Sequence, residues 1–446
     1  MKIKVDKITG EIRESDVLDK LGGNTVVSDD FSVANNEWIK AGSYVTTTPA
    51  FVSGKLKINS AGAPSSLLCS YIQRNTIARN FIMSVDMCSG ARDVGTYWSR
   101  ARKHFRESSQ GNYFNSYINS DGTFNLQKVA SSAATAVTSG AIPNHSFDKT
   151  YRVVTKAFEN FISSNLYENG RVLVNLEAVN SDFAASTGKL NGLGSGDTPL
   201  YDNFTFEKLD NFLNIVFLGD SNTLQSGITK GYNTTDELRM TCQNLPVGIF
   251  NKGVSGDRIT NVSARVTADV TGNKVSKARN ICVLQIGTNN VYDGASAATI
   301  MTALESLYDT VLATGFEIWA VTVPPRTDNP SLNSVINDLN TLIKKSAKPT
   351  KIIDLYSSLI SPSSESAVLS GMLRADNLHL DIPAAKIFAD KVKAEILKVY
   401  ASQDVFSLAC EDIKVRNIAS KSAHPTSYKP VFQDTTTKEL YIYTGA

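Results

Sequence analysis

The stretch Asn214-Ile-Val-Phe-Leu-Gly-Asp-Ser-Asn-Thr-Leu224 decides the fold of the second half of the chain. Its apolar run predicts a short buried strand that ends at Gly219 and places Ser221 on the following turn. Open α/β sheets keep their ligand sites at the carboxyl ends of strands. Gly219 permits a sharp turn without a Cβ clash, and a helix beginning after Ser221 would aim backbone N–H groups at a developing oxyanion. Alone, a Gly-Asp-Ser triplet is a weak indication, since most such triplets are ordinary turns.

Three later stretches supply the other groups that acyl transfer needs. Asn251-Lys-Gly-Val-Ser-Gly-Asp-Arg258 places glycine just after a second predicted strand, where a backbone N–H can approach a substrate closely. Gly287-Thr-Asn-Asn290 follows a third apolar strand and supplies a side-chain amide. Asp376-Asn-Leu-His379 offers a carboxylate and an imidazole three residues apart. With Ser221 these stretches provide a nucleophile, a base, an orienting acid and oxyanion donors.

These four blocks, in this order, resemble those of the SGNH (GDSL-type) hydrolases. The resemblance covers residues 207–402 and rests on Gly219-Asp220-Ser221, on Gly256 within Asn-Lys-Gly-Val-Ser-Gly-Asp, on Asn289 within Gly-Thr-Asn, and on Asp376-x-x-His379. It implies that Ser221, Asp376 and His379 form a catalytic triad. It also implies an oxyanion hole made by the backbone N–H groups of Ser221 and Gly256 and the amide of Asn289, with no cofactor and no metal.

Two places in these blocks depart from the family pattern. The same residues also test the other common class of serine hydrolases, the α/β-hydrolases. Asn222-Thr223 stands where the commoner signature has leucine soon after the serine, and Asn290 replaces a frequent aspartate. These departures put the subfamily and the substrate in doubt. An α/β-hydrolase elbow needs Gly-x-Ser-x-Gly, but Thr223 occupies the last glycine position, and Ser221 follows the first strand of the alternation rather than a later one. The α/β-hydrolase class is therefore disfavoured.

The length and composition of the chain exclude several classes of protein. A chain of 446 residues is long enough for two or three domains, and its formal charge of +2 does not draw it to nucleic acid or an anionic membrane. No apolar run approaches the length of a spanning helix. Five cysteines without a Cys-x-x-Cys pair make a disulfide framework and a zinc site improbable. The charged start lacks an apolar core region, so we expect no signal peptide.

The first half is expected to contain a lead-in and a β-domain. Residues 1–24 are polar and read either as an attachment segment or as an ordinary disordered terminus. From residue 25 to 206, short runs alternate with period two, with Asp121-Gly122 and Asn169-Gly170 as turns. This pattern predicts an antiparallel β-sandwich, and the order of its strands resembles concanavalin-like jelly-roll modules.

Many such sandwiches bind glycans through exposed aromatic residues, and packing in the core is the alternative role for these side chains. The candidates here are Trp38, Tyr97, Trp98, Tyr113, Phe114 and Tyr117. The basic run Arg100-Ala-Arg-Lys-His-Phe-Arg106 is expected to be a solvated strand and turn. His104 and His145 have no partners at ligand spacing and receive no role.

Residues 207–402 alternate strand with helix. Such βα units predict a three-layer, flavodoxin-like αβα domain with a parallel five-stranded sheet. The predicted strands are Phe212–Leu218, Val247–Phe250, Ile281–Ile286, Phe316–Val323 and Lys351–Leu355. The predicted helices are Asp236–Asn244, Asp257–Val270, Ala295–Ala313, Ser331–Lys345 and Pro383–Val399. The whole chain is thus expected to be multidomain, a sandwich followed by an α/β domain.

Residues 403–446 form a third segment, which is expected to be a short β-hairpin tail. The run from Pro430 to Gly445, with Asp-Thr-Thr and an aromatic pair before Thr-Gly, resembles the end of many bacteriophage tail-fibre and tailspike chains. An ordinary hairpin that caps the preceding domain is the alternative.

Together these features lead us to expect a serine esterase that removes O-acyl groups, acetyl foremost, from a bacterial surface polysaccharide. The tail resemblance implies a phage tail fibre or tailspike, located in the virion or outside the cell. It further implies a homotrimer, contacts with other virion tail proteins, and a sandwich that holds the glycan. Two alternatives stay open: a non-catalytic receptor-binding fibre, and a lipase or lysophospholipase of the same family.

Overall fold

The computed structural model describes residues 26–30, 32, 38–41, 50–52, 55–57, 69–73, 78–88, 101–109, 112–131, 133–195, 199–363, 367–407, 431–433 and 440–442. The chain divides into two units, residues 24–392 and the remaining residues at both ends. The predicted lead-in, residues 1–24, lies outside the described residues, as do Tyr97 and Trp98. In the part of the chain that is described, no helix is long and apolar enough to cross a membrane.

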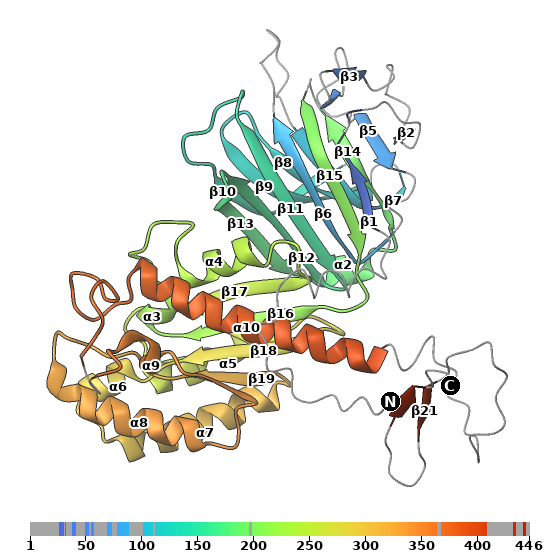
Figure 1. Ribbon diagram of the computed structural model, residues 1–446. Helices are drawn as coiled ribbons and strands as arrows, with labels where there is room; N and C mark the ends of the chain where they lie inside the picture. Colours follow the sequence, from blue (N-terminus) through green and yellow to red (C-terminus); the bar gives the residue numbers. More distant parts are fainter. Residues whose placement is uncertain are drawn as a thin grey trace. The chain divides into compact units, whose positions relative to one another are not determined.

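Two antiparallel sheets build the sandwich, residues 26–208 (Figure 1). The first has the order β13-β12-β11-β6-β15-β4-β3, with β1 paired to β15. Its strands are β1 Val26–Asp29, β3 Ala50–Val52, β4 Lys55–Lys57, β6 Phe81–Cys88, β11 Thr150–Phe158, β12 Phe161–Glu168, β13 Arg171–Val179 and β15 Leu200–Lys208. The second has the order β10-β9-β8-β7-β14-β5-β2. Its strands are β2 Trp38–Ala41, β5 Cys69–Gln73, β7 Ala101–Ser109, β8 Asn112–Ile118, β9 Thr123–Ala130, β10 Ala133–Ala141 and β14 Leu190–Ser195, and a short helix, α2 Ser181–Ala185, precedes β14.

Alternating apolar residues of both sheets meet in one core. Phe81 of β6 packs against Phe105 of β7, with 6.1 Å between ring centroids, and Phe114 lies in the same buried cluster. At the β12–β13 hairpin both Asn169 and Gly170 have positive φ, as a type I′ turn requires. The predicted antiparallel sheets are confirmed, whereas the jelly-roll connectivity stays a prediction.

The basic run of β7 differs from its prediction. Arg102, Lys103, His104 and Arg106 are buried rather than solvated. The cause is that other segments cover both faces of β7: Lys103 faces the opposite sheet, and Arg106 donates to the carbonyl oxygens of Arg79, Glu159 and Phe183. The Lys103 ammonium lies between the sheets and donates hydrogen bonds to two carbonyl oxygens of the opposite sheet, at 3.2 and 3.1 Å. Burial lowers the pKa of Lys103 well below its usual value.

The second half contains the predicted parallel sheet, which is confirmed with the order β17-β16-β18-β19-β20. Its strands are β16 Leu213–Gly219, β17 Val247–Gly253, β18 Arg279–Gln285, β19 Glu317–Val321 and β20 Lys351–Ile353. The helices are α3 Ser221–Leu224, α4 Thr234–Thr241, α5 Ile259–Asp269, α6 Thr288–Tyr292, α7 Ala297–Ala313, α8 Asn333–Lys345, α9 Tyr356–Leu359 and α10 Ile382–Ser407, with 3-10 turns η1 Thr271–Asn273 and η2 Pro330–Leu332. Each of the five predicted helices begins within two residues of its expected start.

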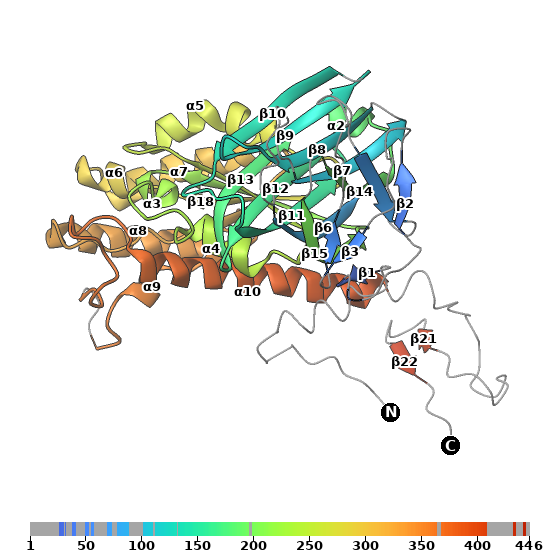
Figure 2. The same ribbon diagram turned by 90° about the horizontal axis from the view of Figure 1, so that it is seen from above.

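Helices cover both faces of this sheet, as continuous apolar strands require. Val216 and Leu218 of β16 share a buried cluster with Val262 of α5. Phe217, on the opposite face, meets Phe388 near the start of α10, with 5.8 Å between ring centroids. Figure 2 shows α5 and α7 on one side of the strands and the start of α10 on the other. The three layers of the αβα domain follow from this alternation.

The edge strand β17 is covered by the sandwich. The Lys156 ammonium of β11 donates to the carbonyl oxygens of Cys242 and Val247, at 2.9 and 3.1 Å. Phe161 of β12 packs on Phe250 of β17, with 5.7 Å between ring centroids. An uncovered edge would expose unpaired backbone groups to other chains. The sandwich and the αβα domain therefore share one buried core.

The end of the chain shows two further features. Helix α10 runs to Ser407, through the predicted boundary between residues 402 and 403. Strands β21 Val431–Gln433 and β22 Leu440–Ile442 pair antiparallel, as a hairpin tail requires. The remainder of the predicted tail after residue 407 lies outside the described residues.

Candidate active site

The predicted nucleophile lies on a turn that only glycine permits. A Cβ added at Gly219 would lie 2.0 Å from the backbone oxygen of Gln285 in the neighbouring strand β18. The chain then turns into α3, which begins at Ser221 with Asp220 as its N-cap. Asp220 accepts a hydrogen bond from the backbone N–H of Asn222 at 2.9 Å. Ser221 is thus held at the carboxyl end of β16, where the sequence places it.

The predicted base and acid lie together on a short loop. Asp376 Oδ1 accepts hydrogen bonds from the backbone N–H groups of Leu378 and His379, at 3.0 and 2.9 Å. Asn377 adopts a left-handed φ of 59°, which bends the loop so that both side chains lie on one side. His379 Nδ1 then lies 2.9 Å from Asp376 Oδ2. Because the two residues are three positions apart, one short loop holds both side chains in contact without help from another segment.

The imidazole links this loop to the nucleophile. His379 Nε2 lies 2.8 Å from Ser221 Oγ. With a proton on Nδ1 donated to Asp376, Nε2 is free to accept the Ser221 hydroxyl proton. The side chains of Ser221, His379 and Asp376 therefore form one hydrogen-bonded chain, in the order that the predicted roles of nucleophile, base and orienting carboxylate require.

The carboxylate of this chain stays ionised. Partial burial by itself raises the pKa of Asp376, but hydrogen bonds from the backbone and ring of His379 and from the backbone of Leu378 outweigh that effect. The net result lowers the pKa of Asp376 to about 2. The carboxylate is thus negative at neutral pH and can stabilise a protonated imidazole.

Asn222, which the sequence analysis treated as a departure from the family pattern, holds the two loops together. Its side-chain oxygen accepts a hydrogen bond from the backbone N–H of Leu380 at 3.0 Å. Leu380 directly follows His379, while Asn222 directly follows Ser221. This contact fixes the base loop against the nucleophile turn, although the two lie 158 residues apart in sequence. A leucine at position 222 could not make it.

The three predicted oxyanion donors each follow the carboxyl end of one of three neighbouring strands, Ser221 after β16, Gly256 after β17 and Asn289 after β18, and their convergence on one oxyanion stays a prediction. Gly256 lies in an exposed turn with φ of +81°. The turn is joined to β16 because Val254 N–H donates to Gly219 O at 3.1 Å. Asn289, in α6, donates one amide hydrogen to Asp257 O at 2.8 Å. An amide has two N–H bonds, and the second has no acceptor among the described residues.

A cluster of buried and half-buried charged side chains next to Gly219 was not predicted from the sequence. Arg265 of α5 donates to Gly219 O at 2.8 Å and to Lys252 O at 2.7 Å, and it pairs with Asp257. Arg265 thereby joins β16, the strand that precedes Ser221, to the loop after β17 that contains Gly256 (the oxyanion loop). Burial, together with repulsion by Asp257, raises the pKa of Asp220 to about 7. The only sign of this cluster in the sequence is an arginine on the predicted helix Asp257–Val270.

Among the described residues, no group of three or more His, Cys, Asp or Glu side chains is placed to hold a metal ion. His104 is buried beside Tyr113, with 4.6 Å between ring centroids, and His145 contacts the Tyr151 hydroxyl. The described histidines outside the triad are thus engaged in packing within the sandwich.

Comparisons with known proteins bear on the αβα domain. Residues 217–381 match the model of the GDSL-like lipase/acylhydrolase family. No curated protein matches the chain.

Three solved structures illustrate the likenesses found. A lipolytic protein of the G-D-S-L family from Veillonella parvula is 19% identical, covering 41% of this chain and 96% of that one, with a TM-score of 0.36. The acetylxylan esterase Axe2 from Geobacillus stearothermophilus is 18% identical over 41% and 93%, with a TM-score of 0.33. The carbohydrate binding module CBM66 from Bacillus subtilis is 16% identical over 39% and 96%, with a TM-score of 0.31. Likenesses this weak carry no conclusion about this chain.

The matched range includes Ser221, Gly256, Asn289, Asp376 and His379. The sequence of residues 217–381 therefore matches the GDSL-like lipase/acylhydrolase family, which its four blocks resemble.

Proposed function

We propose that this protein is a serine esterase that removes O-acyl groups, foremost acetyl, from a polysaccharide. The observation that carries the proposal is the hydrogen-bonded chain of Ser221, His379 and Asp376, with contacts of 2.8 and 2.9 Å. A chain of this kind activates a serine for attack on an acyl carbon. It argues against an inert, purely binding role.

In the proposed reaction, Ser221 Oγ attacks the ester carbonyl while His379 Nε2 takes its proton. His379 then gives that proton to the departing sugar hydroxyl, which leaves an acyl-enzyme. Water, activated by the same imidazole, releases the carboxylic acid and restores Ser221. Asp376 holds the tautomer and stabilises the imidazolium throughout.

Charge that develops on the carbonyl oxygen is stabilised by the backbone N–H groups of Ser221 and Gly256 and by the remaining N–H of Asn289. Removing one such donor costs roughly 3 to 4 kcal/mol of transition-state stabilisation in related chemistry. The exposed turn at Gly256 suits a substrate that approaches from solvent, such as an ester on a polymer chain.

A short acyl group is favoured over a lipid by the surroundings of the site. Large apolar side chains with substantial exposure are few among the described residues: Val254, Tyr292, Leu312, Leu369 and Ile382. Val254, Tyr292 and Ile382 follow or precede the site residues Gly256, Asn289 and His379 by two or three positions, a small set that suits a short acyl group. A lipid-binding face would need a contiguous apolar patch. The supporting features thus point to a polar substrate with a small ester.

Acetate release from a panel of O-acetylated xylan, mannan and bacterial capsular polysaccharide tests this function. We expect release from at least one polymer, and none above background with Ser221→Ala. Hydrolysis of 4-nitrophenyl acetate without release from any polymer would overturn the polysaccharide as substrate. Near-normal rates in Ser221→Ala would overturn the assignment of the nucleophile.

The setting that we propose for this activity is a phage tail fibre or tailspike, acting on the surface glycan of a host. The support is the paired β21 and β22, within a segment whose sequence resembles fibre ends. Such fibres commonly assemble as parallel trimers, which would present three sites to one surface. Light scattering tests this setting: we expect a trimer, and a 48.3 kDa monomer at all concentrations would overturn it.

A further inference from the structure

A cleft lies where the sandwich meets the αβα domain along the edge strand β17. Its volume is about 350 Å³, within the range of roughly 300–1,000 Å³ that small-molecule sites occupy. Both regions contribute to its walls. The lining residues on which the inference depends are Thr138, Asn175 and Glu177 of the sandwich and Leu224, Arg239 and Lys252 of the αβα domain. This space is named the junction cleft.

The floor of the junction cleft is a buried, fully paired charge network. Arg239 forms two parallel hydrogen bonds to the Glu177 carboxylate, at 2.9 and 3.0 Å, and a third to Asp236 at 3.0 Å. The Arg239 and Asp236 side chains are only 4% and 0% exposed. A network in which each charge has its partner does not call for a bound ion. It provides a rigid polar base.

Two polar side chains at the rim of the junction cleft, Asn175 and Lys252, have hydrogen-bond donors without a partner among the described residues. The Asn175 oxygen accepts from Lys230 at 2.6 Å, but its NH₂ group donates to no partner within the described residues. Lys252 has no carboxylate partner in that same part of the chain, and its ammonium lies 5.8 Å from the Phe250 ring. Thr138 adds a hydroxyl from β10. Several donors, few apolar groups and little net charge suit a ligand rich in hydroxyl groups.

The junction cleft adjoins the segments that carry the chemistry. Leu224 ends the helix α3 that Ser221 begins, and Lys252 lies four residues before Gly256. Asn251 ties these segments together, because its amide donates to Thr223 O at 3.0 Å. The junction cleft is therefore connected to the segments that carry Ser221 and Gly256 through α3 and β17, although neither of these two residues lines it.

We propose that the junction cleft is a carbohydrate subsite, in which Asn175 and Thr138 of the sandwich and Lys252 of the αβα domain bind hydroxyl groups of the acylated polymer. This inference rests on the proposed esterase function and extends it. The sandwich then contributes directly to substrate binding at the edge of the catalytic domain.

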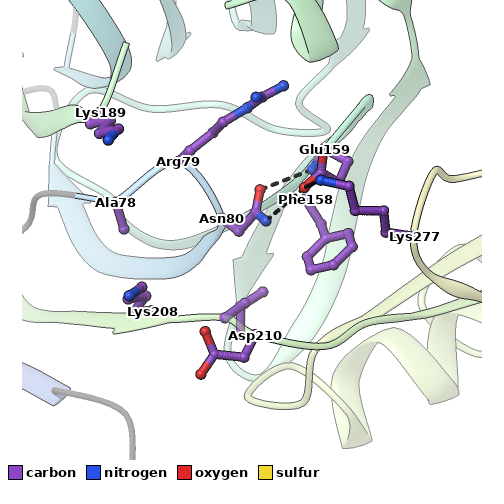
Figure 3. Close-up of a pocket in the computed structure, with 10 residues that line it drawn as sticks. Ala78, Arg79, Asn80, Phe158, Glu159, Lys189, Lys208, Asp210 and Lys277 are labelled. Atoms are coloured by element: carbon purple, nitrogen blue, oxygen red, sulfur yellow. Dashed lines mark hydrogen bonds and ion pairs between the residues drawn. The ribbon is translucent and has the colours of Figure 1, made fainter. Parts of the chain in front are cut away.

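A second cleft provides a matched control. Figure 3 shows it, with a volume of about 450 Å³, between the base of the sandwich and the loops before β16 and β18. Asp210 and Lys277 mark its place at the amino ends of these strands, whereas Ser221 follows a carboxyl end. Asn80, drawn there with dashed lines, is engaged by Glu159 at 3.0 and 3.3 Å. Lys208 of this second cleft is therefore a lysine that lines a cleft at the opposite end of the parallel strands from Ser221.

The test compares kcat/KM on two substrates: the O-acetylated polysaccharide that gives the highest rate in the panel above, and 4-nitrophenyl acetate. The ratio of the two values cancels any loss of folded protein. We expect Asn175→Ala and Lys252→Ala each to lower this ratio about tenfold, mainly through KM, as the loss of about one hydrogen bond to substrate implies. Thr138→Tyr, which fills the junction cleft, should lower it further. Lys208→Ala should leave the ratio as it is in the native protein.

Ratios in the Asn175, Lys252 and Thr138 variants that match that of Lys208→Ala would overturn the subsite. In that case Ser221-dependent acetate release from the polysaccharide would still support the esterase function. Conversely, a native protein that releases acetate only from 4-nitrophenyl acetate would overturn the proposed substrate class, and the subsite with it.

Discussion

The carboxyl end of the parallel sheet and the junction with the sandwich are both rich in polar side chains, and they differ in how completely those side chains are paired. At the carboxyl end, the His379 and Asp376 side chains are 27% and 42% exposed, and Asn289 keeps one N–H without a described acceptor. At the junction, Arg239 is nearly inaccessible and donates to two carboxylates and to the Ile249 carbonyl. In the proposed mechanism the unpaired donor at the carboxyl end stabilises a transition state, whereas the fully paired donors at the junction hold two layers together.

The largest effect that this comparison predicts is on the rate, with little change in stability. Ser221→Ala should lower kcat on 4-nitrophenyl acetate by roughly five orders of magnitude or more, because nucleophile and base act as a unit. Its free energy of unfolding should change by less than about 1 kcal/mol, since the side chain is partly exposed. Kinetic assays and urea unfolding measure the two quantities. A His379→Ala/Ser221→Ala double variant much slower than either single variant would contradict the unit.

Asp376→Asn should have the next largest effect. The amide cannot hold the required imidazole tautomer, so kcat should fall by roughly four orders of magnitude while a small activity remains. Circular dichroism checks that the fold is intact. A loss of less than tenfold would show that another group orients His379.

Arg239→Met should lower the stability of the fold, whereas the two preceding substitutions lower the activity. It leaves the buried Glu177 carboxylate without its arginine partner, while Asp236 keeps its ion pair with Lys230, and the unfolding free energy should fall by about 3–5 kcal/mol. The control is Lys386→Ala, which breaks the exposed Lys386–Asp390 pair of α10 and should cost less than about 0.5 kcal/mol. Equal losses in the two variants would mean that the junction network does not hold the layers together.

Asp220→Asn should change how the unfolding free energy depends on pH. The pKa of Asp220 is raised from 3.8 to about 7 in the folded protein, so the folded state retains a proton that the unfolded state has lost. The native protein should therefore lose stability as pH rises from about 4 to 7, and be flat above. The variant lacks this titration, so its unfolding free energy should gain about 2–4 kcal/mol relative to the native protein across that range.

Urea unfolding at intervals from pH 4.5 to 8.5 measures this difference. A difference between Asp220→Asn and native protein that does not vary with pH would show that Asp220 titrates normally. Activity is a second readout, because Asp220 caps the helix of the nucleophile.

Much of the αβα domain could be predicted because its rules are local. A strand is recognised from a run of neighbouring apolar residues, and a helix from the period of its apolar residues. The separation of three residues between Asp376 and His379 lets one loop hold the pair, so this contact too could be read from the chain.

Other features depend on segments that the sequence does not bring together. Lys103 is buried because the opposite sheet covers its face of β7, and the local alternation of β7 does not tell which segment covers a face. The Arg239–Glu177 pair joins residues 62 apart, and Asn222 reaches a backbone N–H 158 residues away. Partner choice at such distances follows from packing and not from spacing.

The sequence by itself determined the alternation of strand and helix, the four blocks and the identity of the candidate nucleophile, because periodicity, turn chemistry and residue type act over a few residues. Only the tertiary structure decided that the sandwich covers β17, that Arg265 joins the nucleophile strand to the oxyanion loop, and that two regions share the junction cleft. The physical reason is that burial and charge pairing depend on which distant segments come into contact. The residue type of a side chain allows several possible partners, and tertiary packing determines which of them it contacts.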